Sequence, residues 1–310
     1  MLLSVIIPCF NEEGVIAESY RRLDAVMKSL SSYDYELIFI NDGSRDKTLA
    51  LLRDLARKDT HVKVLNFSRN FGHQAAVTAG MKECNGDLAV IIDADLQDPP
   101  EVIVEMLEVY LNEECNVVYG VRKKRKGETF FKVLTAKLFY RFLNSLSDIS
   151  FPVDTGDFRL VDRKIIDTFN SLHEKNKYIR GLISWIGYKQ CPVYYERDAR
   201  FAGETKYPFR KMLKFASIAL FYFSKKPLKL ATSVGFTSIL VGLALAIYII
   251  AGKVFGFAHV VSGWTSTIIV IIFFGGVQLL TIGVLGQYIG SLFDEVKNRP
   301  EYIIESKENL

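Results

Sequence analysis

An acidic run that directly follows an apolar stretch carries the most chemical information in this sequence. Residues 88–92 are apolar and predict a buried strand, and they lead into Asp93-Ala94-Asp95-Leu96-Gln97-Asp98-Pro99-Pro100-Glu101. Two carboxylates one residue apart at a strand end repel each other, unless a divalent cation lies between them and an anionic ligand. The prolines and acids beyond them suit the first turn of a helix. The run therefore predicts metal-assisted binding of a nucleotide diphosphate, with an acidic surface turn as the alternative.

The elements that must position these carboxylates alternate between strand and helix over about the first 220 residues. Short apolar runs predict the strands, and amphipathic stretches between them predict the helices. The strands are expected at residues 4–7, 36–40, 62–65, 88–92 and 116–119, and the helices at 12–30, 46–58, 73–84 and 100–112. This alternation predicts an α/β fold with a mostly parallel sheet covered on both faces, whose ligands bind beyond the carboxyl ends of the strands.

Polar residues gather at the predicted strand ends, as a ligand site there requires. The first three strands lead into Pro8-Cys9-Phe10-Asn11-Glu12-Glu13, Asn41-Asp42-Gly43-Ser44 and Asn66-Phe67-Ser68-Arg69-Asn70-Phe71-Gly72. Asp42 can accept hydrogen bonds from a base or ribose, or it can form a turn or helix cap. Phe10 can lie against a base or in the core. Arg69 and the amides near Gly72 can face phosphate at a helix start, unless Gly72 only forms a turn.

Composition limits the classes to which the protein can belong. The chain has 310 residues, of which 49% are hydrophobic, and its net charge of +4 gives no reason to expect nucleic acid binding. The four cysteines, at positions 9, 84, 115 and 191, are scattered, which predicts reduced thiols rather than disulfides or a zinc site. The four histidines are dispersed as well, which disfavours a histidine metal site.

Two long uncharged stretches near the C-terminus predict membrane spans. Residues 230–252 and 264–293 contain no Asp, Glu, Lys or Arg, and each exceeds the roughly 20 residues that cross a bilayer. A buried helical hairpin is the less favoured alternative. Basic residues flank the outer ends of both stretches, whereas the connection between them holds Lys253 alone. The positive-inside rule then predicts a multi-pass protein of the inner membrane, with the N-terminal domain and both termini in the cytoplasm.

Together, the strand-end motifs resemble the signature of family 2 glycosyltransferases with the GT-A fold, on residues 8–13, 41–44 and 93–99. Within that family the chain is similar to the polyprenyl-phosphate glycosyltransferases, which include dolichyl-phosphate mannose synthase and the bactoprenol glucosyltransferases. Its two predicted spans match the bactoprenol branch. The resemblance implies a Rossmann-like GT-A domain and Mg²⁺ or Mn²⁺ held by Asp95 and Gln97, with Asp93 nearby. It implies a nucleotide site lined by Pro8, Phe10, Asn11, Glu12, Asp42, Asp93 and Ala94.

The resemblance also places Asp157 at the position of the catalytic base, where it would accept a proton or orient the sugar. The alternative is a turn residue that caps a helix near Asp162. A lipid phosphate is already largely ionised at neutral pH, so a strong base is less necessary, but a carboxylate beside that phosphate requires cations nearby. The candidates for binding the lipid phosphate are Arg122, Lys132, Arg200 and Lys206, and the alternative for each is a solvated face beside anionic headgroups.

The predicted organisation has one amphipathic helix within the catalytic domain and a second one between that domain and the spans. Apolar residues spaced by three and four, interleaved with basic ones, are typical of helices that lie in the membrane interface. The predicted segments are a catalytic domain over residues 1–207 with an interfacial helix at about 128–145, a juxtamembrane helix at 208–229, spans at 230–252 and 264–293, and a cytoplasmic tail at 294–310.

The resemblance, together with these observations, implies an inverting, metal-dependent transfer of a hexose to undecaprenyl or another polyprenyl phosphate. UDP-glucose is the favoured donor, and GDP-mannose or a UDP-amino sugar is the alternative. A processive polysaccharide synthase is disfavoured because the two tryptophans, Trp185 and Trp264, do not fit a Gln-x-x-Arg-Trp motif. A membrane nucleotide-binding module without turnover is disfavoured because binding alone does not need Asp157. A homo-oligomer is left open.

Overall fold

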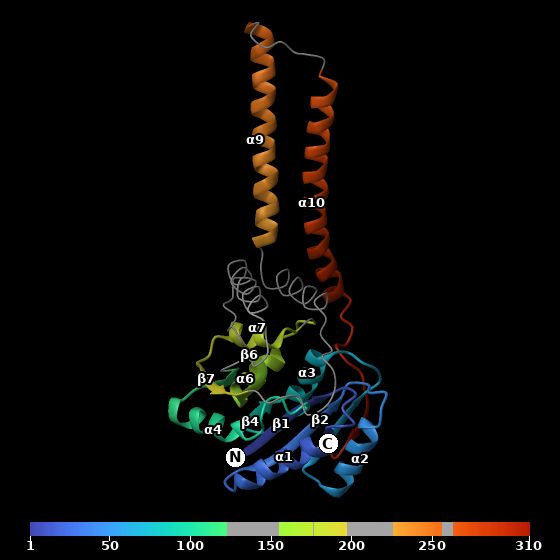
Figure 1. Cartoon of the computed structure of the whole chain (residues 1–310), viewed down its shortest axis with the longest axis vertical. Coiled ribbons are helices and arrows are strands. Elements are labelled where there is room, and N and C mark those ends of the chain that lie inside the picture. Colours follow the sequence, from blue (N-terminus) through green and yellow to red (C-terminus); the bar gives the residue numbers. More distant parts are fainter. Residues whose placement is uncertain (123–154, 176, 197–225, 256–262) are drawn as a thin grey trace. The chain divides into compact units, whose positions relative to one another are not determined.

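The computed structural model describes residues 1–122, 155–175, 177–196, 226–255 and 263–310. The chain divides into two compact units. The first unit contains the N-terminal domain together with the C-terminal tail, Asn298–Leu310, and the second contains the two long C-terminal helices. Figure 1 labels most of the helices and strands of both units.

One eight-stranded sheet forms the centre of the first unit, in the order β7-β5-β6-β4-β1-β2-β3-β8. Its parallel part consists of β4 (Leu88–Ile91), β1 (Leu2–Cys9), β2 (Asp34–Asn41) and β3 (Val62–Phe67). Beside β4, the antiparallel strand β6 (Thr155–Asp162) is followed by β5 (Val117–Arg122) and the edge strand β7 (Gln190–Tyr195). At the other edge, β8 (Ile304–Glu308) runs antiparallel to β3. The carboxyl ends of the parallel strands meet at one edge of the sheet, where a ligand site is expected.

Helices cover both faces of this sheet because its strands are apolar on both faces. On one face, Val5 and Ile7 of β1 belong to a core cluster that also takes in side chains of α1 (Ile16–Ser29), α2 (Thr48–Lys58) and α4 (Val102–Glu113). On the other face, α3 (His73–Glu83) packs so closely that a Cβ on Gly80 would lie 2.3 Å from a methyl group of Ile6. Two shorter helices, α6 (Arg163–Ser171) and α7 (Ile179–Ile186), follow β6.

The predicted fold class is confirmed, since the sheet is mostly parallel and helices alternate with strands from β1 to β5. The prediction of four reduced cysteines is wrong for two of them. Cys115 and Cys191 form a disulfide, with their Cα atoms 6.1 Å apart, whereas Cys9 and Cys84 are free and buried. The two partners lie 76 residues apart in the chain, and the parallel pairing of β5 with β7 brings them together. The spacing of the cysteines alone could not reveal that pairing.

The second unit contains α9 (Lys226–Phe255) and α10 (Trp264–Val296). Within the described residues, two helical segments are long and apolar enough to cross a membrane, Lys226–Tyr248 with a mean hydropathy of 2.1 and Ile269–Val296 with 2.3. Large apolar side chains such as Ile239 and Leu279 are well exposed along them, as expected for helices that face lipid. The interfacial helix predicted at 128–145 and the segment 208–225 lie outside the described residues.

Candidate active site at the strand ends

Hydrogen bonds between side chains and backbone amides join the loops that follow β1 and β2. The Asn11 amide donates to Ser44 Oγ at 2.9 Å, and the Arg45 amide donates to Asn11 Oδ1 at 2.9 Å. The Glu12 amide donates to Thr48 Oγ1 at 2.9 Å. The predicted nucleotide residues at this position are therefore held in a fixed loop, beside a buried Pro8 and a half-buried Phe10.

Asp42, at the end of β2, fixes the loop between β3 and α3. Its carboxylate accepts hydrogen bonds from the amides of Phe71 at 2.6 Å and Gly72 at 2.9 Å, and from Asn70 Nδ2 at 2.8 Å. Burial raises the pKa of Asp42, and the two amide donors oppose that increase. The structure thus shows that Asp42 anchors a neighbouring loop, a role that the sequence analysis did not include. Contact of Asp42 with a base or ribose stays a prediction.

The acidic loop after β4 is anchored by the residues between its acids. Ala94 and Leu96 are 2% and 3% exposed, and Leu96 adopts a left-handed backbone conformation with φ of 57°. The amide of Gln97 donates to Asp95 Oδ1 at 3.1 Å. Burial raises the pKa of Asp93, and three neighbouring carboxylates add to the increase, whereas the charge of His73 opposes it. The loop therefore holds concentrated negative charge that a cation would stabilise.

The donor set of this loop fits a metal ion that binds together with a nucleotide. Among the residues that the structure describes, no three His, Cys, Asp or Glu side chains are grouped to hold a metal by themselves. Mg²⁺ commonly needs only one or two carboxylates when substrate phosphates supply further oxygens. Asp93, Asp95 and Gln97 offer hard oxygen ligands of that kind.

Asp157 is surrounded by positively charged side chains, whereas Asp93 is surrounded mainly by other acids. Asp157 lies within β6 and is only 8% exposed. Its Oδ1 lies 2.6 Å from Arg180 Nε of α7, and its Oδ2 lies 3.0 Å from His73 Nε2 at the start of α3. Although burial raises the pKa of Asp157, Arg180 and His73 together hold it well below its ordinary value. The alternative of a turn residue is wrong, because Asp162 itself caps α6 by accepting the Ile165 amide.

His73 connects the two acidic centres. Besides its contact with Asp157, its Nδ1 lies 3.7 Å from Asp93 Oδ1. Burial lowers the pKa of His73, but Asp93 and Asp157 outweigh that effect and raise it to about 9. A cationic imidazole therefore lies between the acidic loop and the carboxylate of β6.

Residues 4–169, which include these strand-end loops, α3 and β6 but not α7, fit the family described as Glycosyl transferase family 2. The chain belongs to that family. This glycosyltransferase is 50% identical over 307 residues to the uncharacterized glycosyltransferase YkcC of Bacillus subtilis (strain 168), which covers 99% of this chain and 94% of YkcC. It is 37% identical over 305 residues to the prophage bactoprenol glucosyl transferase homolog of Escherichia coli (strain K12), covering 98% of this chain and 99% of that protein.

Among solved structures, the mannosyltransferase PcManGT from Pyrobaculum calidifontis, in complex with GDP-Man and Mn²⁺, overlaps this glycosyltransferase with a TM-score of 0.45. The overlap covers 93% of this chain and 86% of that one, at 16% sequence identity. A likeness of this size has no bearing on the site. The resemblance to family 2 that the strand-end motifs indicated is thus confirmed by the sequence relatives.

Arg122 of the glycosyltransferase, a predicted ligand of the lipid phosphate, lies beside the acidic loop. Its Nη2 is 3.3 Å from Asp98 Oδ2, and Tyr195 donates its hydroxyl to Asp98 Oδ1 at 2.5 Å. A Cβ on Gly156 would lie 2.6 Å from the same Nη2, so the guanidinium also packs against β6. The buried carboxylate of Asp98 balances the charge of Arg122, and its binding of a lipid phosphate stays a prediction. Lys132, Arg200 and Lys206, the other candidates, lie outside the described residues.

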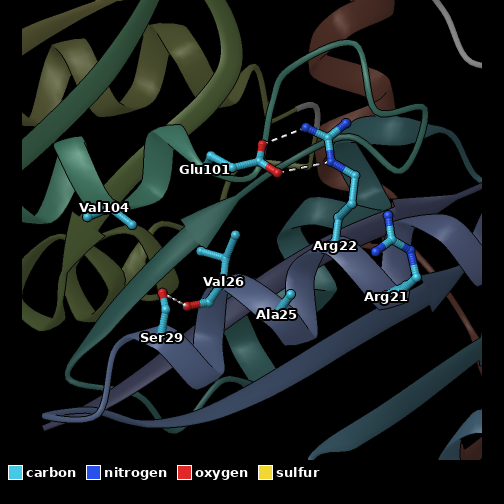
Figure 2. Close-up of a pocket in the computed structure, with 7 residues that line it drawn as sticks. All are labelled: Arg21, Arg22, Ala25, Val26, Ser29, Glu101 and Val104. Carbon is cyan, nitrogen blue, oxygen red and sulfur yellow. Dashed lines mark hydrogen bonds and ion pairs between the residues drawn. The ribbon is translucent and has the colours of Figure 1, made fainter.

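A shallow depression between α1 and α4 lies on the surface of the glycosyltransferase, lined by Arg21, Arg22, Ala25, Val26, Ser29, Glu101 and Val104 (Figure 2). Its polar side chains are engaged by neighbouring protein groups, and Arg21 is paired with Glu18 outside it. Arg22 Nη2 lies 2.5 Å from Glu101 Oε2, and Ser29 Oγ donates to the Val26 carbonyl at 2.6 Å. The strand-end loops, rather than this depression, therefore form the candidate active site.

Sequence reasoning missed three members of the site: His73, Arg180 and Gln74, whose Nε2 lies 3.5 Å from Asp157 Oδ2. His73 and Gln74 directly follow the motif that ends in Gly72, so their place at a helix start was a usable signal. Arg180 had no such signal, because the short helix α7 was not predicted.

Proposed function

We propose that this glycosyltransferase transfers a hexose from a nucleotide sugar to a polyprenyl phosphate, with inversion, at the cytoplasmic face of the membrane. The favoured donor is UDP-glucose and the favoured acceptor is undecaprenyl phosphate. One observation carries the proposal: an acid-rich loop suited to a metal and a diphosphate lies next to a carboxylate that is already balanced by cations. The full-length relatives named as bactoprenol glucosyl transferases support the acceptor and the sugar.

On the donor side, Asp93, Asp95 and Gln97 would hold Mg²⁺ or Mn²⁺ against the diphosphate. When bound, the ion neutralises the charge that grows on the diphosphate as the glycosidic bond breaks. The loops fixed by Asn11 and Asp42 would enclose the nucleotide. In this assignment the chain's own contribution is a preformed loop geometry, which lowers the cost of ordering the site when substrate binds.

On the acceptor side, we infer that Asp157 orients the reacting groups and does not remove a proton. A carboxylate whose pKa is held well below its ordinary value by Arg180 and His73 is a weak base near neutral pH. The acceptor phosphate oxygen is already ionised and needs no base. It would attack the anomeric carbon and form the new bond, while the nucleoside diphosphate leaves with the electrons of the broken bond.

The C-terminal tail supports the proposed membrane topology. Strand β8 joins the sheet of the N-terminal domain, so the tail and the domain lie on the same side of any membrane that α9 and α10 cross. Two crossings return the chain to its starting side. Basic residues flank the outer ends of these helices, at Lys226, Lys229, Lys297 and Arg299. By the positive-inside rule, they support a cytoplasmic location for the domain and the tail.

Purified full-length protein tests the proposal directly. It is mixed with labelled UDP-glucose, Mg²⁺ and undecaprenyl phosphate in detergent, and a matched sample omits the lipid. Label that moves into the organic phase only when the lipid is present supports the proposal. Label in polymer would indicate a processive synthase, and bound nucleotide without product would indicate a binding module. If UDP-glucose fails, product masses from GDP-mannose and UDP-amino sugars identify the donor.

A further inference from the structure

The tail that follows α10 is built into the sheet beside β3. The register pairs Val64 with Glu308 and Asn66 with Ser306, and the Ser68 amide donates to the Ile303 carbonyl at 3.1 Å. The ring of Tyr302 stacks on Phe67, with centroids 5.0 Å apart and planes inclined by 11°. The tail therefore lies against the same strand whose end leads into the loop held by Asp42.

Side chains on neighbouring helices bind the far part of the tail. Arg53 of α2 lies 3.0 Å from Glu308, and Lys307 lies 2.6 Å from Glu83 of α3. Asn309 donates to the carbonyl of Ala56 at 2.7 Å. These contacts explain how the strand is retained at the sheet edge, although its sequence has no apolar face.

Glu301, just before β8, contacts α3 directly. The single hydroxyl hydrogen of Thr78 is shared between two acceptors, Glu301 Oε1 at 3.2 Å and the Gln74 carbonyl at 2.9 Å. The side chain of Gln74 in turn accepts the amide of Ile179 at 2.9 Å, and its Nε2 lies 3.5 Å from Asp157 Oδ2. A continuous set of contacts thus leads from the tail through the first turns of α3 to Asp157.

Glu301 also interacts with the segment that precedes α7. Burial raises the pKa of Glu301 to about 7, against opposing effects from Lys177, Thr78 and Lys175. Lys177 lies just before the start of α7, and its ammonium group is 4.8 Å from the ring centroid of Phe169. Glu301 therefore contacts α3 through Thr78, and its carboxyl group also interacts with the positive charge of the segment that leads to Arg180.

We propose that Glu301 is a positioning residue, which acts through Thr78 and Gln74 to hold the starts of α3 and α7 at the spacing that brackets Asp157. The segment that emerges from the second C-terminal helix is then part of the acceptor side of the site. The effect on transfer rests on the function proposed above, whereas the effect on the two helix starts does not.

The test compares Glu301→Ala, Glu301→Gln and Thr78→Val with the control Lys307→Ala, which removes a more exposed ion pair from the same tail. Hydrogen exchange of the full-length protein in detergent is the first readout. Faster exchange at residues 73–78 and 179–182 is expected in Glu301→Ala and Thr78→Val, because each loses the contact that holds these helix starts. Lys307→Ala should leave that exchange unchanged.

Kinetics supply the second readout. Glu301→Ala should lower kcat about tenfold, as a small misplacement of reacting groups would, with KM for the donor and affinity for UDP unchanged. Glu301→Gln keeps an acceptor for Thr78 and should stay within about threefold of wild type. Should Glu301→Ala fail to fold, Thr78→Val provides the same comparison.

The two readouts separate the possible failures. Unchanged exchange at both helix starts would overturn the proposal, whichever sugar or acceptor the enzyme uses. Faster exchange with unchanged kcat would overturn it as well, because the tail would then be structural only. A wild-type enzyme that transfers nothing to lipid phosphate would refute the proposed function, while the exchange data would still decide whether Glu301 positions the helices.

Discussion

The two acidic centres of the site differ in what surrounds them. Asp93 is close to three other carboxylates and its pKa is raised, whereas Asp157 is held by Arg180 and His73 and its pKa is lowered. Burial acts in the same direction on both, so the difference comes from their charged neighbours. The comparison teaches that one centre is suited to receive a cation and the other keeps its negative charge fixed without one.

Removing a carboxylate from the acidic loop should have the largest effect. Asp95→Asn is expected to lower the initial rate of sugar transfer by at least about 100-fold, because a metal ligand contributes several kcal/mol of transition-state stabilisation. The measurement is the initial rate at increasing Mn²⁺, with the melting temperature as a check on folding. Glu105→Gln, an exposed position on α4, is the matched control. Full activity in Asp95→Asn would remove the metal assignment.

Asp157→Asn tests the other centre. We expect turnover to fall about 100-fold, because the reacting groups lose a fixed charged contact, while affinity for UDP stays at the wild-type level. Steady-state rates and UDP titration measure the two quantities separately. An equal loss of both would indicate a structural role for Asp157.

Arg180→Met should change the pH dependence of the rate. Without Arg180 the pKa of Asp157 rises, so its carboxylate protonates at a higher pH. The rate of the variant should therefore begin to fall at a higher pH than in wild type as the solution is acidified, in addition to a loss of about tenfold near neutral pH. A profile of kcat against pH between about pH 4.5 and pH 8, recorded for wild type and Arg180→Met, measures this shift. If the rate of Arg180→Met falls at the same acidic pH as that of wild type, Arg180 does not control the protonation of Asp157.

Glu301→Gln should have the smallest effect, on stability. Because the folded state raises the pKa of Glu301 to about 7, wild type loses stability as the pH rises from about 4.5 to about 7, since only the unfolded form ionises freely. The amide has no such loss. Glu301→Gln should therefore gain on the order of 1 kcal/mol relative to wild type at pH 8 compared with pH 5. Urea unfolding at the two pH values measures it, and a pH-independent difference would contradict the assignment.

The sequence predicted the donor half of this comparison better than the acceptor half. Asp42, Asp93 and Asp95 follow strands with strong apolar signals, and parallel strands bring their ends together. Asp157 itself and its partner Arg180 lie on elements with weak local signals, whereas its other partner, His73, begins a predicted helix. Arg180 lies on a helix of eight residues, and β6 runs antiparallel where alternation with helices predicted parallel neighbours.

The tail shows a further limit of reasoning from local pattern. The sequence of β8, Ile304–Glu308, has no face that consists of apolar residues. Its pairing with β3 depends on backbone hydrogen bonds and on ion pairs with distant residues. Nothing in its composition distinguishes it from a solvated tail. The disulfide between Cys115 and Cys191 was missed for the same reason, because the contact is set by strand order.

Titration of Mn²⁺ into the full-length protein, with and without UDP, tests the central claim most directly. Wild type should bind Mn²⁺ at least about tenfold more tightly when UDP is present, because the phosphates complete the ligand set. Asp95→Asn should lose this UDP-dependent binding, whereas Asp157→Asn should retain it. Equal Mn²⁺ affinity with and without UDP, or its loss in Asp157→Asn but not in Asp95→Asn, would contradict the account.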